Sequence, residues 1–400
     1  MKYRIDKKNG NELSILGFGC MRFPKILNKI DMEKTEELII YAVEKGINYF
    51  DTAYIYGGSE VVLGKILKKN NLREKIYIAT KLPIFKIKSK QDFDKYFNLQ
   101  LKRLQTDYID YYLMHSINDS ASWETLVAMG IEEWIREKKE SGEIKQIGFS
   151  YHGTKDEFIK ILDAYSWDFT QIQYNYSDEN YQAGITGLKK AYSKGIPVII
   201  MEPLLGGKLV NGLSKETKDI FKKCNSEYSL VKWALRWLWH LEEVTVLLSG
   251  MSTMEQLTQN IDIANVSEIG MLNKKELETY KLVEESIKAT KKIPCTGCNY
   301  CMPCPKGVNI PSCFAAYNTS YTVGYFMGFD QYIMSTGATS VKESRASLCI
   351  KCGKCEVHCP QKIKIRESLG LVKKRLEPFW YRLFLKIARK IIVKKKKVVE

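Results

Sequence analysis

Eight short apolar runs, separated by longer amphipathic segments, constrain the fold of this chain more than any other feature. The runs span residues 15–20, 47–52, 76–81, 108–115, 144–150, 169–174, 197–201 and 244–249. Strand patterns that alternate with helix patterns are typical of a parallel sheet whose strands are joined by helical crossovers. Eight such units in about 250 residues predict a TIM (β/α)8 barrel. An open doubly wound sheet is the alternative, but it does not explain eight regular units, and no GxGxxG follows the first run.

Segments around these runs complete the expected barrel. Amphipathic patterns predict helices over residues 33–45, 123–141, 154–165 and 274–291. Near the amino terminus, Asn9-Gly10 separates two short strand patterns. This is a strong turn signal, and it predicts a hairpin that plugs the bottom of the barrel.

The cysteines are concentrated in one segment, since nine of the eleven lie between Cys295 and Cys359. They form two runs that each end in Cys-Pro, namely Cys295-x2-Cys298-x2-Cys301-x2-Cys304-Pro305 and Cys349-x2-Cys352-x2-Cys355-x3-Cys359-Pro360. The second run has the spacing of bacterial ferredoxins, in which three close thiolates bind one 4Fe-4S cluster and the fourth cysteine ligates the partner cluster. The spacing therefore predicts two clusters with crossed ligand sets, one of Cys295, Cys298, Cys301 and Cys359 and the other of Cys304, Cys349, Cys352 and Cys355.

Alternatives to this interpretation stay open. The first run has two residues before its last cysteine instead of three, so one cluster or two are both consistent with the spacing. Structural zinc is the other alternative, although zinc sites use paired CxxC motifs rather than triplets with a trailing Cys-Pro. We expect Cys20, Cys224 and Cys313 to pack as small apolar residues, and His358 to be a solvated neighbour of a cluster.

The net charge of +16 is concentrated at the carboxyl end. Residues 362–400 contain fourteen Lys or Arg and three acidic residues, which leaves about +5 for the rest of the chain. Residues 379–393 have a basic amphipathic pattern, which predicts a helix that either lies on an anionic membrane surface or docks on the cluster domain. Nucleic acid is a poor partner for this helix, because its aromatic residues fall on the apolar face instead of among the cations.

These patterns predict the domain order and the location. We expect a barrel over residues 1–270, a connecting helix over 271–293, a ferredoxin-type 4Fe-4S domain over 294–370 and a basic amphipathic tail over 371–400. The first ten residues are charged, and no run approaches the roughly 18 apolar residues of a membrane span. We therefore expect a cytoplasmic protein, in which reduced thiols remain available as metal ligands.

Four polar side chains lie where predicted strands end, which is the edge at which TIM barrels carry their reactive residues. Asp51 ends the second run, Tyr56 follows it by five residues, Lys81 ends the third run and His115 ends the fourth. Each alone has a structural explanation, as a capping aspartate, one tyrosine among twenty-four, a solvated lysine or a core histidine. Their joint placement on successive strand ends favours a shared active site.

This arrangement resembles the aldo-keto reductase family, and the cysteine-rich segment makes it similar to the iron-sulfur, ferredoxin-domain-containing subgroup. The DTA-x2-YG pattern of residues 51–57, together with Lys81 and His115, carries the resemblance, which spans the whole barrel. Further matching motifs are Leu16-Gly17-Phe18-Gly19, Gly148-Phe149-Ser150, Gln173, Pro203-Leu204 and Gln259-Asn260. The resemblance implies a nicotinamide cofactor, NADP or NAD, that lies across the carboxyl face of the barrel. The residues implied to bind it are Ser150, Gln173, Pro203, Leu204, Gln259 and Asn260.

The resemblance also implies a role for each strand-end residue. A carbonyl that accepts a hydride becomes an alkoxide, which a positioned acid must protonate. Tyr56 would be the proton donor, and Lys81 would lower the pKa of its phenol by favouring the phenolate. Asp51 would hold Lys81 by an ion pair, and His115 would donate the hydrogen bond that orients the carbonyl.

Some positions depart from the family pattern. Tyr151 stands where many members carry Asn, and Met201 stands where an aromatic ring often stacks on the nicotinamide. The lysine and arginine that usually grip the 2'-phosphate of NADPH fall on Gly250 and Gln256, and neither residue supplies a cation. A cation from elsewhere, such as Lys208, could replace them, so NADP and NAD both stay open.

Two functions are consistent with these features. The first is NAD(P)H-dependent reduction of an aldehyde or ketone, with a small-molecule carbonyl as substrate. The alternative is an electron-transfer protein whose clusters serve a redox partner protein and whose barrel is a weakly active or regulatory scaffold. A nicotinamide passes two electrons as a hydride, each cluster passes one, and no flavin motif is evident, so the role of the clusters stays open.

Overall fold

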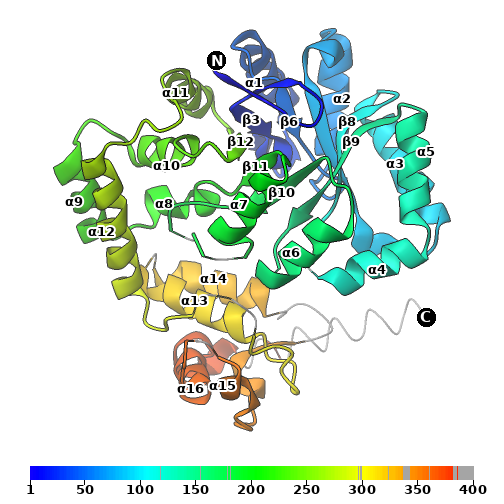
Figure 1. Cartoon of the computed structure of the whole chain (residues 1–400). Coiled ribbons are helices and arrows are strands. Elements are labelled where there is room, and N and C mark those ends of the chain that lie inside the picture. Colours follow the sequence, from blue (N-terminus) through cyan, green and yellow to red (C-terminus); the bar gives the residue numbers. More distant parts are fainter. Residues whose placement is uncertain are drawn as a thin grey trace. The chain divides into compact units, whose positions relative to one another are not determined.

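A computed structural model describes residues 1–117, 119–153, 155–177, 179–180, 182–295, 297, 300–322, 324–336, 343–359, 361–381 and 385 (Figure 1). The chain divides into two compact units. The first unit contains Met1–Gly206 and Tyr228–Lys274, and the second contains Gly207–Glu227 and Lys275–Glu400. Our four-part division of the sequence stays a prediction.

Eight parallel strands close into a barrel in the first unit (Figure 1). In barrel order they are β3 (Leu16–Gly19), β6 (Tyr49–Asp51), β7 (Tyr77–Leu82), β8 (Ile109–Met114), β9 (Ile144–Tyr151), β10 (Phe169–Gln173), β11 (Val198–Met201) and β12 (Val244–Ser249). Each strand overlaps one predicted run. β12 pairs with β3, with Leu247 opposite Leu16, and this pairing closes the sheet. The predicted TIM barrel is therefore confirmed, and the open doubly wound sheet is wrong.

Helices connect the strands, as parallel strands require. In this unit they are α1 (Met32–Glu44), α2 (Ser59–Lys69), α3 (Gln91–Leu104), α4 (Ser120–Ala128), α5 (Ile131–Glu140), α6 (Lys155–Ala164), α7 (Gly184–Ser193), α10 (Leu230–Trp239) and α11 (Met254–Asn265). The prediction of one helix over residues 123–141 is wrong. α4 and α5 meet at Gly130, whose φ of 89° is a left-handed conformation that a glycine adopts without strain and that interrupts the helix.

The amino-terminal hairpin is present where the sequence predicts it. β1 (Tyr3–Ile5) pairs antiparallel with β2 (Glu12–Ser14), and Gly10 in the turn has a φ of 81°. Leu13 packs among the apolar side chains inside the barrel, next to residues such as Tyr111, so the hairpin covers that end of the core. A second, unpredicted hairpin consists of β4 (Lys25–Ile26) and β5 (Lys29–Ile30).

The second unit is helical and has its own apolar core. Its helices are α8 (Lys208–Asn211), α9 (Lys215–Cys224), α12 (Lys274–Thr290), α13 (Ile310–Thr322), α14 (Tyr325–Ser335), α15 (Lys354–Val357) and α16 (Ile365–Leu376). α12 agrees with the helix predicted over residues 274–291. Side chains of α13, α14 and α16, among them Phe314, Tyr332 and Leu369, form the core, and most described cysteines of the two runs pack against it.

Most of the basic tail lies outside the described residues, which end with 361–381 and 385. Tyr381 and Leu385, four residues apart, are buried in the core of the second unit. Phe379 and Trp380 are exposed. Docking of this segment on the cluster domain requires buried apolar residues, and Tyr381 and Leu385 meet that requirement. Within the described part of the chain, every helix is too short or too polar to cross a membrane.

Candidate active site and cluster domain

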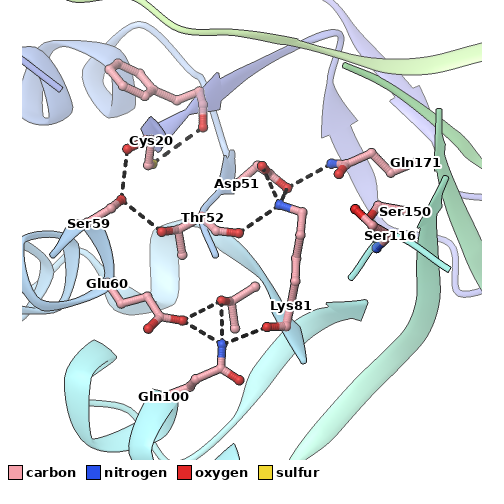
Figure 2. A network of polar contacts seen from close by, with 12 residues as sticks. Cys20, Asp51, Thr52, Ser59, Glu60, Lys81, Gln100, Ser116, Ser150 and Gln171 are labelled. Atoms are coloured by element: carbon pink, nitrogen blue, oxygen red, sulfur yellow. Dashed lines mark hydrogen bonds and ion pairs between the residues drawn. The ribbon is translucent and has the colours of Figure 1, made fainter. Parts of the chain in front are cut away.

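The four strand-end residues lie together at the carboxyl ends of β6, β7 and β8. Lys81 donates hydrogen bonds from Nζ to both carboxylate oxygens of Asp51 at 2.7 Å and to the carbonyl oxygen of Thr52 at 2.8 Å (Figure 2). The ring of Tyr56 is centred 5.1 Å from the same Nζ, and its centroid lies 6.3 Å from that of His115. The Lys81 ammonium therefore contacts the Asp51 carboxylate and lies close to the Tyr56 ring, and the Tyr56 ring lies close to that of His115.

Burial and the Lys81–Asp51 ion pair set the protonation of this group. Burial lowers the pKa of Lys81, but Asp51 and Tyr56 more than offset this, so the pKa is raised and the side chain stays charged at neutral pH. Burial raises the pKa of Tyr56, and the opposing effect of Lys81 is smaller. The net direction differs from our expectation, because removing the phenol from water disfavours the phenolate more than the ammonium favours it. Tyr56 therefore carries its proton at neutral pH.

His115 is neutral in this site. Its pKa is lowered to about 3, first by burial and then by the charges of Lys81 and His152. A neutral imidazole has one N–H donor and no charge, so it can orient an acceptor by a hydrogen bond. Its Nδ1 has no hydrogen-bond partner among the described residues. His152, directly after β9, is a second, half-buried histidine of this region that the sequence did not single out.

The low pKa of His115 predicts how the stability of the barrel depends on pH. In the unfolded chain this histidine takes up a proton near its ordinary pKa of about 6.5. In the folded chain it does so only near a pKa of about 3. Between these values the unfolded state binds more protons, so the free energy of unfolding falls as the pH decreases. We expect His115→Gln to flatten this decline.

Tryptophan fluorescence can measure this effect on the barrel, because six of the seven tryptophans lie in the first unit. Denaturant unfolding of wild type and His115→Gln would be compared between pH about 6.5 and about 4. Parallel curves of unfolding free energy against pH would contradict a buried neutral His115.

Gln171 is a member of this site that our sequence analysis missed. It lies on β10 and donates from Nε2 to Oδ2 of Asp51 at 2.8 Å (Figure 2). The Asp51 carboxylate thus has a partner besides Lys81, which fixes its orientation. Side chains of a strand alternate between its two faces, so Gln171 points to the same face as Gln173. That alternation, applied to Gln173, was the signal that could have revealed it.

A second buried network supports the backbone at Lys81 (Figure 2). Gln100, from α3, donates to the carbonyl oxygen of Lys81 at 3.1 Å and to Oε1 of Glu60 at 2.6 Å. Thr80 donates to the same carboxylate at 2.7 Å, and Arg103 pairs with its other oxygen at 3.0 Å. Both oxygens of the buried Glu60 carboxylate therefore have partners, and the network fixes β7 at the residue that carries the ammonium.

The six predicted cofactor residues lie at the carboxyl ends of β9 to β12 or in the segments that follow. Three are buried and hydrogen-bonded within the protein. Ser150 accepts a hydrogen bond from the Ser116 N–H at 2.8 Å (Figure 2), and Gln173 accepts one from Gln182 at 2.8 Å. Asn260 donates a hydrogen bond to Ser249 at 3.0 Å. Of the other three, Pro203 is buried, Leu204 is half-buried and Gln259 is exposed. Their contact with a cofactor stays a prediction.

Arg22 lies beside Gly250, one of the two positions at which this sequence lacks the cation that the family usually carries. Its side-chain carbons lie 3.4 to 3.5 Å from the position that a Cβ on Gly250 would occupy. Its Nη2 lies 3.3 Å from the corresponding position on Gly206. Arg22 is exposed and forms no ion pair with any residue that the structure describes. A free guanidinium therefore lies between the segments that follow β11 and β12, whereas Lys208 belongs to the second unit.

Four cysteines surround one pocket in the second unit. They are Cys304, Cys349, Cys352 and Cys355, and the pocket is also lined by Lys306, Ile310, Arg366 and Leu369. These four are the set that the crossed pattern assigns to one cluster. Of the other set, Cys295, Cys301 and Cys359 are half-buried against the core, and Cys298 lies outside the described residues. Among the residues described, no three or more His, Cys, Asp or Glu side chains have the arrangement that would hold a single metal ion.

Backbone N–H groups point at the first thiol of each run. Gly297 donates to Sγ of Cys295, and Lys351 donates to Sγ of Cys349, both at 3.4 Å. The donors are in the left-handed conformation, with φ values of 72° and 60°. Hydrogen bonds to sulfur stabilise thiolates and influence the potential of a bound cluster. The thiols and these donors fit 4Fe-4S clusters.

The two cysteine runs belong to an internal repeat that our sequence analysis missed. Gly307 donates to the carbonyl oxygen of Cys304 at 2.8 Å, and Lys362 donates to that of Cys359 at 3.0 Å. Both donors have positive φ, and buried apolar residues follow each of them at the first and third positions. The second of these apolar residues begins a helix, α13 or α16. The extra residue before Cys359 shifts the spacing between the halves, which obscured the repeat in the sequence.

Comparisons with known proteins agree with a barrel that is followed by a cluster domain. Residues 15–281 match the model of the Aldo/keto reductase family, and residues 294–363 match that of a 4Fe-4S dicluster domain. The probable aldo-keto reductase 1 of Glycine max is 30% identical over 292 residues, which cover 63% of this chain and 81% of that protein. The aldo-keto reductase yakc of Schizosaccharomyces pombe, whose name includes NADP(+), is 25% identical over 226 residues, which cover 53% and 64%. The solved holo form of aldo-keto reductase AKR11C1 from Bacillus halodurans has a TM-score of 0.58 at 24% identity and covers 71% of this chain and 96% of its own.

Proposed function

This chain belongs to the aldo/keto reductase family, and from that premise we propose that it reduces an aldehyde or ketone with NADPH or NADH. The observation that carries this proposal is the buried Lys81–Asp51 ion pair beside Tyr56 and His115. It combines an acid that keeps its proton at neutral pH with a cation that can stabilise the resulting phenolate. The identity of the carbonyl substrate depends on loops at the barrel mouth.

The mechanism follows from the properties of the four side chains. A bound nicotinamide supplies the hydride. Tyr56 donates its phenolic proton to the carbonyl oxygen as negative charge develops there. Lys81 stabilises the phenolate that remains, and Asp51 keeps the ammonium in place at 2.7 Å. His115, being neutral, orients the carbonyl oxygen by a hydrogen bond without competing for the proton.

The second unit carries a 4Fe-4S dicluster domain, for which two clusters with crossed ligands are the proposed content. The pocket lined by Cys304, Cys349, Cys352 and Cys355 supports this assignment for one cluster. Its four thiols come from both runs, as crossed ligation requires.

Anaerobic assays of the iron-loaded protein test the proposed reaction. NADPH and NADH would be offered with a panel of aldehydes and ketones, and oxidation of the nicotinamide would be followed by its absorbance. Turnover with at least one carbonyl is the expected result. Nicotinamide binding without turnover across the panel would instead favour a regulatory barrel.

The position of Arg22 predicts that the site distinguishes NADPH from NADH. Arginine binds phosphate by charge-assisted hydrogen bonds, and this guanidinium has no other ionic partner among the described residues. We expect Arg22→Gln to weaken NADPH binding by about 10- to 100-fold and NADH binding much less, because NADH lacks the 2'-phosphate. Dissociation constants from fluorescence titration measure both effects. Arg136→Gln, an exposed position on α5, is the control, and an equal loss for NADPH and NADH would contradict a 2'-phosphate contact.

A further inference from the structure

One side of the cluster pocket in the second unit is open to solvent. Cys352 is exposed, whereas Cys304, Cys349 and Cys355, which line the same pocket, are half-buried. Ile350 also lines the pocket and is 59% exposed, so an apolar side chain lies at the open side without cover from the rest of the described protein. An electron would enter or leave a cluster in this pocket most directly through this edge.

Exposed lysines flank the residues of this open side. Lys306 lines the pocket, and Lys351 and Lys354 flank Cys352 in the chain. All three are exposed, and none forms an ion pair with any residue that the structure describes. We call these three lysines the cationic rim. The nearest acidic side chain in the sequence, Glu356, is neutralised by Arg366 at 2.7 Å.

We propose that Cys352, Ile350 and the cationic rim form a docking surface for a small acidic protein that carries one electron. An apolar centre with a polar rim is the usual arrangement of a protein interface, and complementary charges speed the encounter of the two partners. A second copy of this chain that presents the same surface is disfavoured as the occupant, because two cationic rims would repel each other. In the complex one electron passes between the carrier and the cluster, so one is oxidised as the other is reduced, and no bond forms. This inference rests on the proposed cluster in that pocket.

Charge reversal tests the surface. The full-length, iron-loaded protein would carry Lys351→Glu with Lys354→Glu, and the matched control would carry Lys373→Glu with Lys374→Glu, two exposed lysines near the end of α16. The probe is a purified acidic flavodoxin, reduced to its hydroquinone and mixed anaerobically with each protein. We expect the rim variant to accept electrons about 10- to 100-fold more slowly at low ionic strength, with the difference shrinking at high salt.

A second measurement separates docking from cluster loss. Binding of the oxidised flavodoxin would be measured by calorimetry, and iron content and the EPR spectrum of the dithionite-reduced protein would be recorded for each variant. Intact clusters with weaker binding in the rim variant alone support the surface. Equal rates and affinities for the two variants would overturn it, as would tighter rim-dependent binding of a DNA duplex than of flavodoxin. Missing iron in the unmodified protein would instead contradict the proposed clusters.

Discussion

Tyr56→Phe is expected to lower kcat/KM for carbonyl reduction by about 100- to 10,000-fold. The substitution removes one oxygen, and with it the only proton that this ring can donate to the developing alkoxide. The ring itself remains, so the contact with His115 at 6.3 Å between centroids and the packing over Lys81 should persist. Steady-state assays with the best carbonyl substrate measure the loss, and fluorescence titration should give an unchanged dissociation constant for the nicotinamide.

Tyr54→Phe is the matched control, because Tyr54 lies two residues away in the same loop. Its ring is centred 4.5 Å from the guanidinium of Arg103 and packs edge-on against Tyr96, and Tyr54→Phe keeps both ring contacts. The hydroxyl that this variant lacks forms no hydrogen bond with any described residue. We expect its activity to stay within about twofold of wild type, as for most substitutions away from a reacting centre. Equal activities of Tyr56→Phe and wild type would sink the proposed reduction and leave electron transfer as the function of this chain.

The parts of the fold that were predicted from the sequence depend on local periodicity. Each barrel strand is a short apolar run, and its end can be located within one or two residues, which is why Asp51, Lys81 and His115 could be selected together. The helix break at Gly130 was missed, because the apolar pattern continues across it and only the φ of 89° reveals the turn. Composition signals a helix more reliably than it signals an interruption by a single glycine.

The parts of the site that were missed depend on contacts between distant segments. Gln171 reaches Asp51 across 120 positions of sequence, and Arg22 lies against Gly250 from the opposite end of the barrel sequence. The direction of the Tyr56 pKa was also missed, since a spacing pattern reveals a neighbouring ammonium but not how far a phenol is removed from water.

Two double variants should respond in opposite ways if the clusters have crossed ligands. Cys304→Ala with Cys352→Ala removes two thiols that line the same pocket, so one cluster is lost and the other keeps all its ligands. We expect iron to fall from about eight to about four atoms per chain, with one unchanged EPR signal after reduction. Cys301→Ala with Cys304→Ala removes one ligand from each cluster under crossed ligation, so neither signal should survive unchanged.

The two double variants distinguish crossed from uncrossed ligation, because uncrossed ligation predicts that their outcomes are exchanged. If each run bound its own cluster, Cys301 and Cys304 would share one cluster, and that double variant would keep the unchanged signal instead. Zinc in place of iron in the unmodified protein would contradict both arrangements. The one-residue difference between the runs makes this comparison necessary, since the spacing before Cys304 departs from the ferredoxin pattern while the pocket nevertheless brings this thiol beside the second run.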